Sequence, residues 1–567
     1  MVNSQPRSPA ARGSCACRAS LILLAVAAGI APALADTFYV RVDGGNASEC
    51  DGRVDVPYPG VGRNRACAWK HPFIALPPGG QPRIEGGDTL IIGSGSYAMG
   101  LGAPGSGDCH PAYSWDCHMP ALPAGADAAH PTLVLGAGHE AGCTSPPVLW
   151  GTERASVVLN LAGTEHAKVA CLEITDRSPC IEFHCHAGGC GDEILACERE
   201  RPPFGRWAST GIFASDADDI LLIDLHVHGL AGRGIQAGRI ADWHIERVRI
   251  EANGWAGWDG DIGGDSGNSG RIHFLDVDIS YNGCAESWPE REIRGCWAQG
   301  AGGYGDGLGT AATGGEWVFD RVRIHHNTSD GLDLAYLETE SLVKVRRSLF
   351  EGNAGNQVKI AGSATISNSI VVGNCAHFAG HGNFADSDHC RAGGDAIFLG
   401  LAATIESRLV NNSITGEGNC LVSSAGEAGG RLVFANNLFV GQPAHARGRA
   451  SCHFHTDQRE AEITWRNNVS HGVHDAICSV GNACVYEVAI ASTDLDGFDP
   501  TPQEDGPLFG ASRPGYRLGH DFWGFPRSAR NPHVVGAIGP LGRSRAMEAL
   551  RNGLRRPTGG VGQQAAR

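Results

Sequence analysis

A short apolar strand that ends in asparagine recurs in this 567-residue chain from about residue 208 onward. Residues 247–253 (RVRIEAN), 276–282 (DVDISYN) and 321–327 (RVRIHHN) show the pattern clearly. The series of strand-closing asparagines is Asn253, Asn282, Asn327, Asn353 and Asn374, followed by pairs at 411–412, 436–437 and 467–468. The spacing is 21 residues between Asn353 and Asn374, and 25 and 31 residues between the pairs, which is typical of a solenoid with one coil per repeat.

A single coil cannot bury its own apolar side chains. Stacking coils about 4.8 Å apart pairs each strand with the next and joins alternate Val, Ile and Leu residues into one core. Asparagines at equivalent corners tolerate left-handed backbone and can bond to their stacked neighbours. We predict an all-β, right-handed parallel β-helix with disulfide-stapled loops, its main part over residues 208–540. A β-sandwich is the competing fold, and the repetition of one pattern favours the helix.

The region from residue 36 to 207 is predicted to hold N-terminal coils and cysteine-rich loops. Residues 36–42 (DTFYVRV) alternate like a first strand, and residues 86–97 read as a turn, a buried strand and a second turn. The composition of 81 Gly and only 7% aromatic residues suits one long repetitive β domain better than several ordinary domains.

Both ends of the chain are predicted to lie outside the helix. Residues 1–35 are typical of a signal peptide because they combine a basic start, an apolar run and an A-x-A cleavage signal (Arg7, Arg12, Arg18, 21–30 and 33–35). Residues 541–567 are predicted to form a short helix and a partly disordered basic tail. The mature chain has no further stretch able to span a membrane, so we expect a secreted or periplasmic monomer.

Cysteine usage indicates an oxidising compartment. Removing Cys15 and Cys17 with the signal peptide leaves 18 of the 20 cysteines. Close pairs that read as loop staples are Cys109/Cys117, Cys284/Cys296, Cys375/Cys390 and Cys478/Cys484. The cluster of Cys180, His184, Cys185, His186 and Cys190 also has zinc-ligand chemistry, although a disulfide-stapled loop is the favoured interpretation.

The charge balance argues against nucleic acid as a partner. Removing the three arginines and no acids of the signal peptide takes the formal charge from −16 to −19. An acidic polysaccharide would therefore need divalent cations between its carboxylates and those of the protein.

The stretch from 327 to 362 holds the strongest candidate site. Leu332, Leu334 and Tyr336 are predicted to share the inner face of a strand, which turns Asp333 outward. Val358 and Ile360 flank Lys359 in the same way, 26 residues later and so about one coil away. These acids could equally be turn residues, and the lysine an ordinary solvated side chain.

The segments 329–336 (SDGLDLAY), 352–362 (GNAGNQVKIAG) and 368–374 (NSIVVGN) resemble the active-site region of polysaccharide lyase family 9, the calcium-dependent pectate lyases. The resemblance covers about 50 residues. It implies a Ca²⁺ site at Asp306, Ser329, Asp330 and Asp333, with Lys359 as the base that starts β-elimination on a polyuronide. Where the family pattern has a further aspartate this chain has Ser329, which removes one charged ligand.

Other residues are candidates for binding substrate. Trp255 and Trp258 could stack on sugar rings, and Arg346, Arg347 and Arg391 could pair with substrate carboxylates. The nearby acids Asp259, Asp261 and Asp265 could form a second calcium site or simply an acidic loop.

Two functions of different class remain open from the sequence. One is an exported polysaccharide lyase, and the other is a non-catalytic β-helix protein that binds carbohydrate at a surface. The fold is shared by both classes, so only the lysine and acid cluster distinguishes them.

Overall fold

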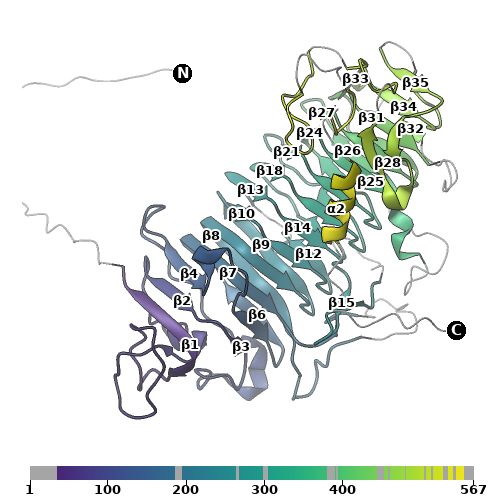
Figure 1. Ribbon diagram of the computed structural model, residues 1–567. Helices are drawn as coiled ribbons and strands as arrows, with labels where there is room; N and C mark the ends of the chain where they lie inside the picture. Colours follow the sequence, from purple (N-terminus) through teal and green to yellow (C-terminus); the bar gives the residue numbers. More distant parts are fainter. Residues whose placement is uncertain are drawn as a thin grey trace, which may run out of the picture. The chain divides into compact units, whose positions relative to one another are not determined.

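The computed structural model of the protein describes residues 35–184, 195–262, 267–297, 304–379, 390, 394–442, 452–457, 460–478, 481–503, 506–512, 515–527, 534–539 and 544–554. From Asp36 onward the chain forms one compact unit, in which strands of successive coils lie side by side (Figure 1). Among the described residues, the strand pairings of the main 33-stranded assembly are parallel, which confirms the predicted right-handed parallel β-helix and excludes the sandwich.

Each coil of the central region contributes three strands, and each strand pairs with its counterpart in the next coil. One coil holds β18 (Glu316–Asp320), β19 (Arg323–His325) and β20 (Leu332–Leu334). The next coil holds β21 (Leu342–Arg346), β22 (Leu349–Glu351) and β23 (Val358–Ala361). We call the three resulting faces sheet A, sheet B and sheet C, in the order in which the chain visits them.

The remaining strands extend these sheets. Sheet A also contains β10 (His244–Glu246), β13 (Arg271–Leu275), β24 (Ser363–Ser367), β27 (Glu406–Val410), β30 (Arg431–Ala435) and β33 (Glu462–Arg466). Sheet B also contains β11 (Arg249–Glu251), β14 (Asp278–Ser280), β25 (Ile370–Gly373), β28 (Ser413–Gly416), β31 (Leu438–Gly441), β34 (Val469–His471) and β35 (Ala483–Val485). Sheet C also contains β9 (Arg233–Ala241), β12 (Ala256–Asp259), β17 (Leu308–Gly309), β26 (Ile397–Leu401), β29 (Cys420–Gly426) and β32 (Cys452–Thr456).

The first coils use longer strands that turn corners without a break. The predicted first strand is β1 (Thr37–Gly45), which pairs with β2 (Thr89–Ile92). The chain then passes through β3 (Ser96–Met99), β4 (Thr132–Gly136), β5 (Val148–Gly151), β6 (Ala155–Asn160), β7 (Glu165–Thr175) and β8 (Ala208–His228). The long strand β8 pairs in turn with β9, β10 and β11, so it crosses all three faces.

A ladder of buried asparagines fixes the corner between sheet B and sheet C. Each side-chain Nδ2 donates to the Oδ1 of the asparagine one coil further on, over 2.9, 2.9 and 2.8 Å for Asn253 to Asn282, Asn282 to Asn327 and Asn327 to Asn353. Gln357 ends this ladder because its Oε1 accepts from Asn353 at 2.8 Å. The ladder satisfies polar groups that are fully removed from water, so it stabilises the register between coils.

Glycines at or just before the start of the sheet C strands make room for that ladder. A Cβ added at Gly331 would lie only 2.6 Å from Asn353 Nδ2 and from the Gln357 carbonyl. A Cβ added at Gly257 would lie 2.7 Å from Asn282 Nδ2, and one added at Gly307 would lie 2.8 Å from Asn327 Nδ2. Close approach of the ladder, rather than backbone freedom, therefore requires glycine here.

The later asparagine pairs occupy a different corner, which corrects the expectation that all the asparagines are equivalent. The pairs 411–412, 436–437 and 467–468 lie between sheet A and sheet B. The first member of each pair adopts a positive φ of 54–56°. The second members form another ladder that runs from Asn412 through Asn437 and Asn468 to Asn482. Two asparagine ladders at different corners therefore hold successive coils together, where a single corner was expected.

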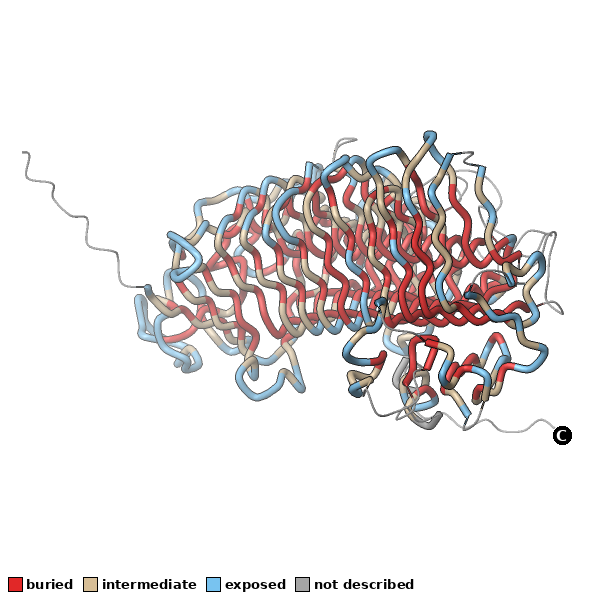
Figure 2. Tube along the Cα trace, turned by 90° about the horizontal axis from the view of Figure 1, so that it is seen from above, coloured by how far each residue is buried: buried red, intermediate tan, exposed pale blue. Residues whose placement is uncertain are grey.

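Burial follows the strand alternation throughout the stack. Figure 2 shows buried segments running through successive coils, with exposed residues gathered in turns and loops. Leu332, Leu334, Val358 and Ile360 are fully buried in this core. Tyr336 is exposed, because β20 ends at Leu334 and the alternation stops there.

The C-terminal segment covers the apolar outer face of sheet B. Phe498, Leu508 and Phe522 pack there against Leu349, Ile370 and other strand residues. The predicted short helix is α2 (Ser544–Leu554), whose Arg551 Nε lies 3.1 Å from Glu351 Oε1. The first part of the predicted tail is therefore packed, and residues 555–567 lie outside the described residues.

Eight disulfides join described cysteines. The four predicted pairs are among them, and the others are Cys50–Cys67, Cys143–Cys171, Cys180–Cys197 and Cys420–Cys452. So many disulfides indicate an extracellular or periplasmic protein. Among the described residues, no helix has the length and apolarity to cross a bilayer.

The Asn327→Ala substitution should destabilise the protein markedly. It removes the partner of Asn282 Nδ2 and a donor to Asn353 Oδ1, and each buried polar group left unsatisfied costs about 1–3 kcal/mol. The midpoint of thermal unfolding should fall, whereas Asn46→Ala at an exposed turn should leave it unchanged. Equal midpoints for the two variants would contradict a stabilising role for the ladder.

Candidate active site

The structure places Asp333 and Lys359 side by side on the outer face of sheet C. Strands β20 and β23 pair in parallel with Asp333 opposite Lys359. In both strands the central residue is partly exposed while its two neighbours are buried. The predicted alternation and the predicted spacing of one coil are both confirmed by this register.

Lys359 contacts two carboxylates at once. Its Nζ lies 2.8 Å from Asp333 Oδ2 and 3.1 Å from Asp330 Oδ2. The exposed fractions are 27% for the Lys359 side chain, 15% for Asp333 and 8% for Asp330. The ammonium therefore bridges two acids at a face that solvent still reaches.

Asp306 and Asp330 also hold the corner between sheet B and sheet C. Asp306 Oδ1 accepts the backbone N–H of Asp330 at 3.0 Å. One coil later, Asp330 Oδ1 accepts the backbone N–H of Asn356 at 2.7 Å and its Nδ2 at 3.1 Å. One carboxylate oxygen of each acid therefore has the structural role of a turn residue, as the alternative interpretation of these acids predicts.

The second oxygens of these acids are placed for other contacts. Asp330 Oδ2 meets Lys359, as described above. Asp306 Oδ2 lies beside Gly309, where an added Cβ would be 2.9 Å away, and Gly309 is the register partner of Asp333. The Asp306 carboxylate therefore lies beside the residue that pairs with Asp333, and the absence of a side chain at Gly309 leaves space for it.

Burial and like charge raise the pKa of Asp333. Burial is the larger cause, the neighbouring Asp330 carboxylate adds to it, and together they raise the pKa of Asp333 to about 6 despite the Lys359 ammonium. Burial alone would lower the pKa of Lys359, but attraction to Asp330 and Asp333 outweighs it and raises that pKa. Lys359 is consequently protonated at neutral pH while it contacts both acids.

Ser329 lies at the same corner as these acids. It is buried, its backbone N–H donates to the Gly305 carbonyl at 3.0 Å, and its own carbonyl accepts from Gly355 at 2.8 Å. A neutral residue here leaves Asp306, Asp330 and Asp333 as the acidic groups of the cluster.

The tryptophan candidates differ sharply in their surroundings. Trp258 is fully buried and packs against Trp243 and Phe274, so it belongs to the core and is not placed to stack on a sugar. Trp255 is half-buried before β12, with the Tyr304 ring 3.7 Å away and the Arg233 guanidinium 4.3 Å from its centroid. Of these two tryptophans, only Trp255 is therefore partly exposed, and other side chains already lie against its ring.

The proposed second calcium cluster is only partly described. Asp259 pairs with Arg233, and its Oδ1 accepts the backbone N–H of Asp261 at 2.9 Å. Asp265 lies outside the described residues. These contacts favour the alternative interpretation as an acidic loop.

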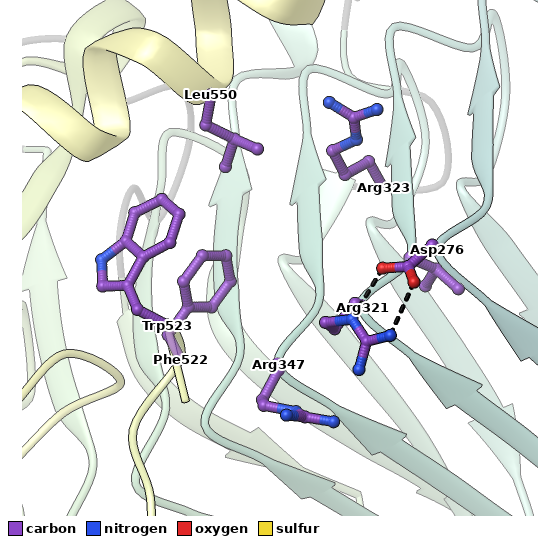
Figure 3. Close-up of a pocket in the computed structure, with 8 residues that line it drawn as sticks. Asp276, Arg321, Arg323, Arg347, Phe522, Trp523 and Leu550 are labelled. Carbon is purple, nitrogen blue, oxygen red and sulfur yellow. Dashed lines mark hydrogen bonds and ion pairs between the residues drawn. The ribbon is translucent and has the colours of Figure 1, made fainter. Parts of the chain in front are cut away.

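Arg346 and Arg347 lie on a different face of the coil from Lys359. Arg346 ends a sheet A strand and Arg347 follows it, and their guanidinium groups lie 2.9 and 2.6 Å from Asp320. Arg347 lines a separate cavity of about 240 Å³ formed with Asp276, Arg321, Val322, Arg323, Phe522, Trp523 and Leu550 (Figure 3). Arg391 lies outside the described residues.

The cysteine and histidine cluster near residue 180 forms a stapled loop where it is described. Cys180 is bonded to Cys197, so its thiolate is not a zinc ligand. His184 Nδ1 accepts the backbone N–H of Leu195 at 2.9 Å. Cys185, His186 and Cys190 lie outside the described residues.

Sequence reasoning missed Asn356 and Gly309. Asn356 follows Asp330 by the same 26 residues that separate Asn327 from Asn353, so the coil spacing could have identified it. Gly309 gives no comparable indication, because its importance comes only from the carboxylate beside it.

The sequence matches no protein-family model and no curated protein. Among solved structures, the chain is similar to pectate lyase Pel9A, with 13% identity, a TM-score of 0.38, and coverage of 89% of this chain and 96% of that one. The complex of XylC with xylose is similar with 10% identity and a TM-score of 0.44, and the match covers 89% of this chain and 99% of that one. An alginate lyase from Paenibacillus sp. str. FPU-7 is similar with 13% identity and a TM-score of 0.32, and the match covers 68% of this chain and 93% of that one. These low values carry no argument about chemistry, and the fold assignment rests on the strand pairings.

Removing the Lys359 ammonium should improve cation binding. In the Lys359→Met variant the carboxylates of Asp330 and Asp333 lose their bridging positive charge, so Ca²⁺ should bind at least about tenfold more tightly, or about 1.4 kcal/mol. Isothermal titration calorimetry on the folded protein measures this directly.

The matched control is Lys344→Met, which removes an exposed lysine paired with Glu316 on sheet A. Its calcium affinity should equal that of the unmodified protein, and Asp333→Asn should weaken binding. Identical affinities for all four proteins would show that these acids do not bind the ion.

Proposed function

We propose that the protein is an exported polysaccharide lyase that cleaves a uronate-containing polymer by calcium-assisted β-elimination, with Lys359 as the base. The observation that carries this proposal is the contact of Lys359 Nζ with both Asp330 and Asp333 on the outer face of sheet C. A lysine and paired acids on one accessible sheet supply a base and an oxygen-rich cation site together.

The reaction requires removal of the proton on C5 of a uronate residue. Lys359 takes that proton, the C5–H electrons form a C4=C5 double bond, and the C4–O bond breaks. The departing oxygen receives a proton from solvent. The products are a new chain end and an unsaturated uronate end.

The donor set of this chain fits Ca²⁺. Asp306, Asp330 and Asp333 offer hard oxygen ligands from two adjacent coils, and burial together with repulsion from Asp330 raises the pKa of Asp333, a cost that a bound cation would relieve. When bound, Ca²⁺ would polarise the substrate carboxylate and so stabilise the charge that develops at C5. Lys359 can act as a base only after its proton is lost, which requires that its two acid partners be neutralised in another way.

Substrate would lie along the outer face of sheet C. Trp255 precedes β12, which is separated from β23 and Lys359 on the same sheet by β17 and β20.

 Stacking on a sugar would use the part of the Trp255 ring that Tyr304 and Arg233 leave exposed, whereas Arg346 and Arg347 lie on other faces of the coil. We therefore place substrate contacts along sheet C rather than at the arginine cavity.

A non-catalytic carbohydrate-binding protein is the second candidate. It is favoured by the structural roles of Asp306 and Asp330, each of which accepts a backbone N–H at a coil corner. Ser329 also favours this candidate, because it is neutral where the pattern of polysaccharide lyase family 9 has an aspartate. In that case Lys359 would be a permanent ion-pair partner and not a base.

A screen of polyuronides separates the two candidates. The protein should generate ultraviolet-absorbing unsaturated ends from one of pectate, alginate or a related polymer when calcium is present, and none when a chelator is added. The Lys359→Ala variant should lose about 10²- to 10⁴-fold in rate, because it removes the proton acceptor.

Lys344→Ala is the matched control, since it removes a more exposed lysine with a single acidic partner. It should retain full activity. Full activity in Lys359→Ala would refute the assigned base, and binding of a polyuronide without any product would favour the non-catalytic candidate.

A further inference from the structure

A second cluster of ionisable side chains lies on the outer face of sheet B, on a different face from Lys359. His226 and His228 alternate with the buried Val227 at the end of β8, so both imidazoles point outward. Glu173 on the neighbouring strand β7 is the register partner of His226. Three metal-ligating side chains from two strands therefore meet at one place.

The distances in this cluster suit a single small ion. One donor atom from each of Glu173, His226 and His228 lies within 4.8 Å of the others. His228 Nε2 is 3.2 Å from Glu173 Oε1, and the two imidazole rings stack with centroids 4.0 Å apart. Shifts of about 1 Å would bring all three donors to bonding distance of one ion, since zinc ligands lie about 2.0–2.2 Å from the metal.

The surrounding carboxylates fit the environment of a metal site. Glu286 Oε2 lies 2.6 Å from His228 Nδ1, the arrangement by which a carboxylate orients a ligating histidine. Glu251 Oε1 lies 2.6 Å from His226 Nε2 and offers a further oxygen donor. Arg249 pairs with Glu251 and Arg291 with Glu173, so Glu286 is the carboxylate of the three that neither guanidinium contacts.

A disulfide-closed loop covers the cluster. Cys284 and Cys296 close the loop that carries Glu286 and Arg291, and its short strands β15 (Ala285–Glu286) and β16 (Ile293–Arg294) pair antiparallel. The side chain of His228 is only 1% exposed beneath it. An ion held here would exchange little with bulk solvent and would tie the loop to sheet B.

We propose that Glu173, His226 and His228 bind one divalent transition-metal ion of the zinc class, with Glu286 orienting His228. Two imidazoles and a carboxylate are donors that such ions prefer, whereas Ca²⁺ and Mg²⁺ select all-oxygen sites. The site is structural: it fastens the 281–297 loop over the outer face of sheet B. It is separate from the calcium-assisted chemistry proposed on sheet C and does not depend on it.

The test is a zinc titration of the folded, chelator-treated protein against a competing chromophoric chelator. One equivalent of Zn²⁺ should bind and raise the thermal midpoint, and excess Ca²⁺ should not displace it. His226→Ala and Glu173→Gln should each lose at least about tenfold in zinc affinity, and Glu286→Gln about 10- to 100-fold. His166→Ala, which removes a histidine paired with Asp219 at 2.8 Å, is the matched control and should bind zinc normally.

A measurement on the unmodified protein guards against variants that fail to fold. Co²⁺ bound in place of Zn²⁺ should give the visible absorption of a four- or five-coordinate site with nitrogen and oxygen ligands. Arg291→Ala should bind zinc at least as tightly as the unmodified protein, because it removes a cation that competes for Glu173. No stoichiometric zinc binding, or binding unchanged in folded His226→Ala and Glu173→Gln, would overturn the proposal.

Discussion

The hydrogen-bonded register between successive coils determines where every outward side chain of this protein lies. Parallel pairing alone repeats the register, but the buried asparagine ladder fixes it at the corner that leads into sheet C. Because Asn327 and Asn353 are locked to each other, the strands that follow them begin in step and Asp333 faces Lys359. A shift of one residue would turn both side chains into the core and abolish the site.

The same corner links stability to chemistry. Asp306 and Asp330 use one oxygen to hold the backbone of the next coil and leave the other near Lys359 or Asp333. Their carboxylates are thus fixed by the fold before any ligand arrives, which limits the reorganisation needed to bind a cation. The raised pKa of Asp333 shows that this arrangement concentrates negative charge where burial opposes it.

Much of this architecture could be predicted because it depends on local alternation. Leu332 and Leu334 around Asp333, and Val358 and Ile360 around Lys359, indicate which side chains face outward, and the 26-residue spacing indicates adjacent coils. The two asparagine corners could not be separated, since both follow short apolar strands. Trp258 is a sequence candidate for sugar stacking, but β12 begins at Ala256 and its pleat turns Trp258 into the core, and the local sequence does not indicate where that strand begins. The contacts of Arg347 with Asp320 and with the cavity beside Trp523 involve the C-terminal segment, which no local pattern links to residue 347.

The most direct test of the account is a pair of crystal structures of the mature protein, one grown without calcium and one soaked in it. In the calcium-free crystal, Lys359 Nζ should lie within hydrogen-bonding distance of both Asp330 and Asp333, as it does here. In the soaked crystal, density for one ion should contact both carboxylates, and the Lys359 amine should have moved away from at least one of them. A lysine that faces another side of the coil, or an unchanged ion pair with no bound ion at saturating calcium, would contradict the assignment of sheet C as the catalytic face.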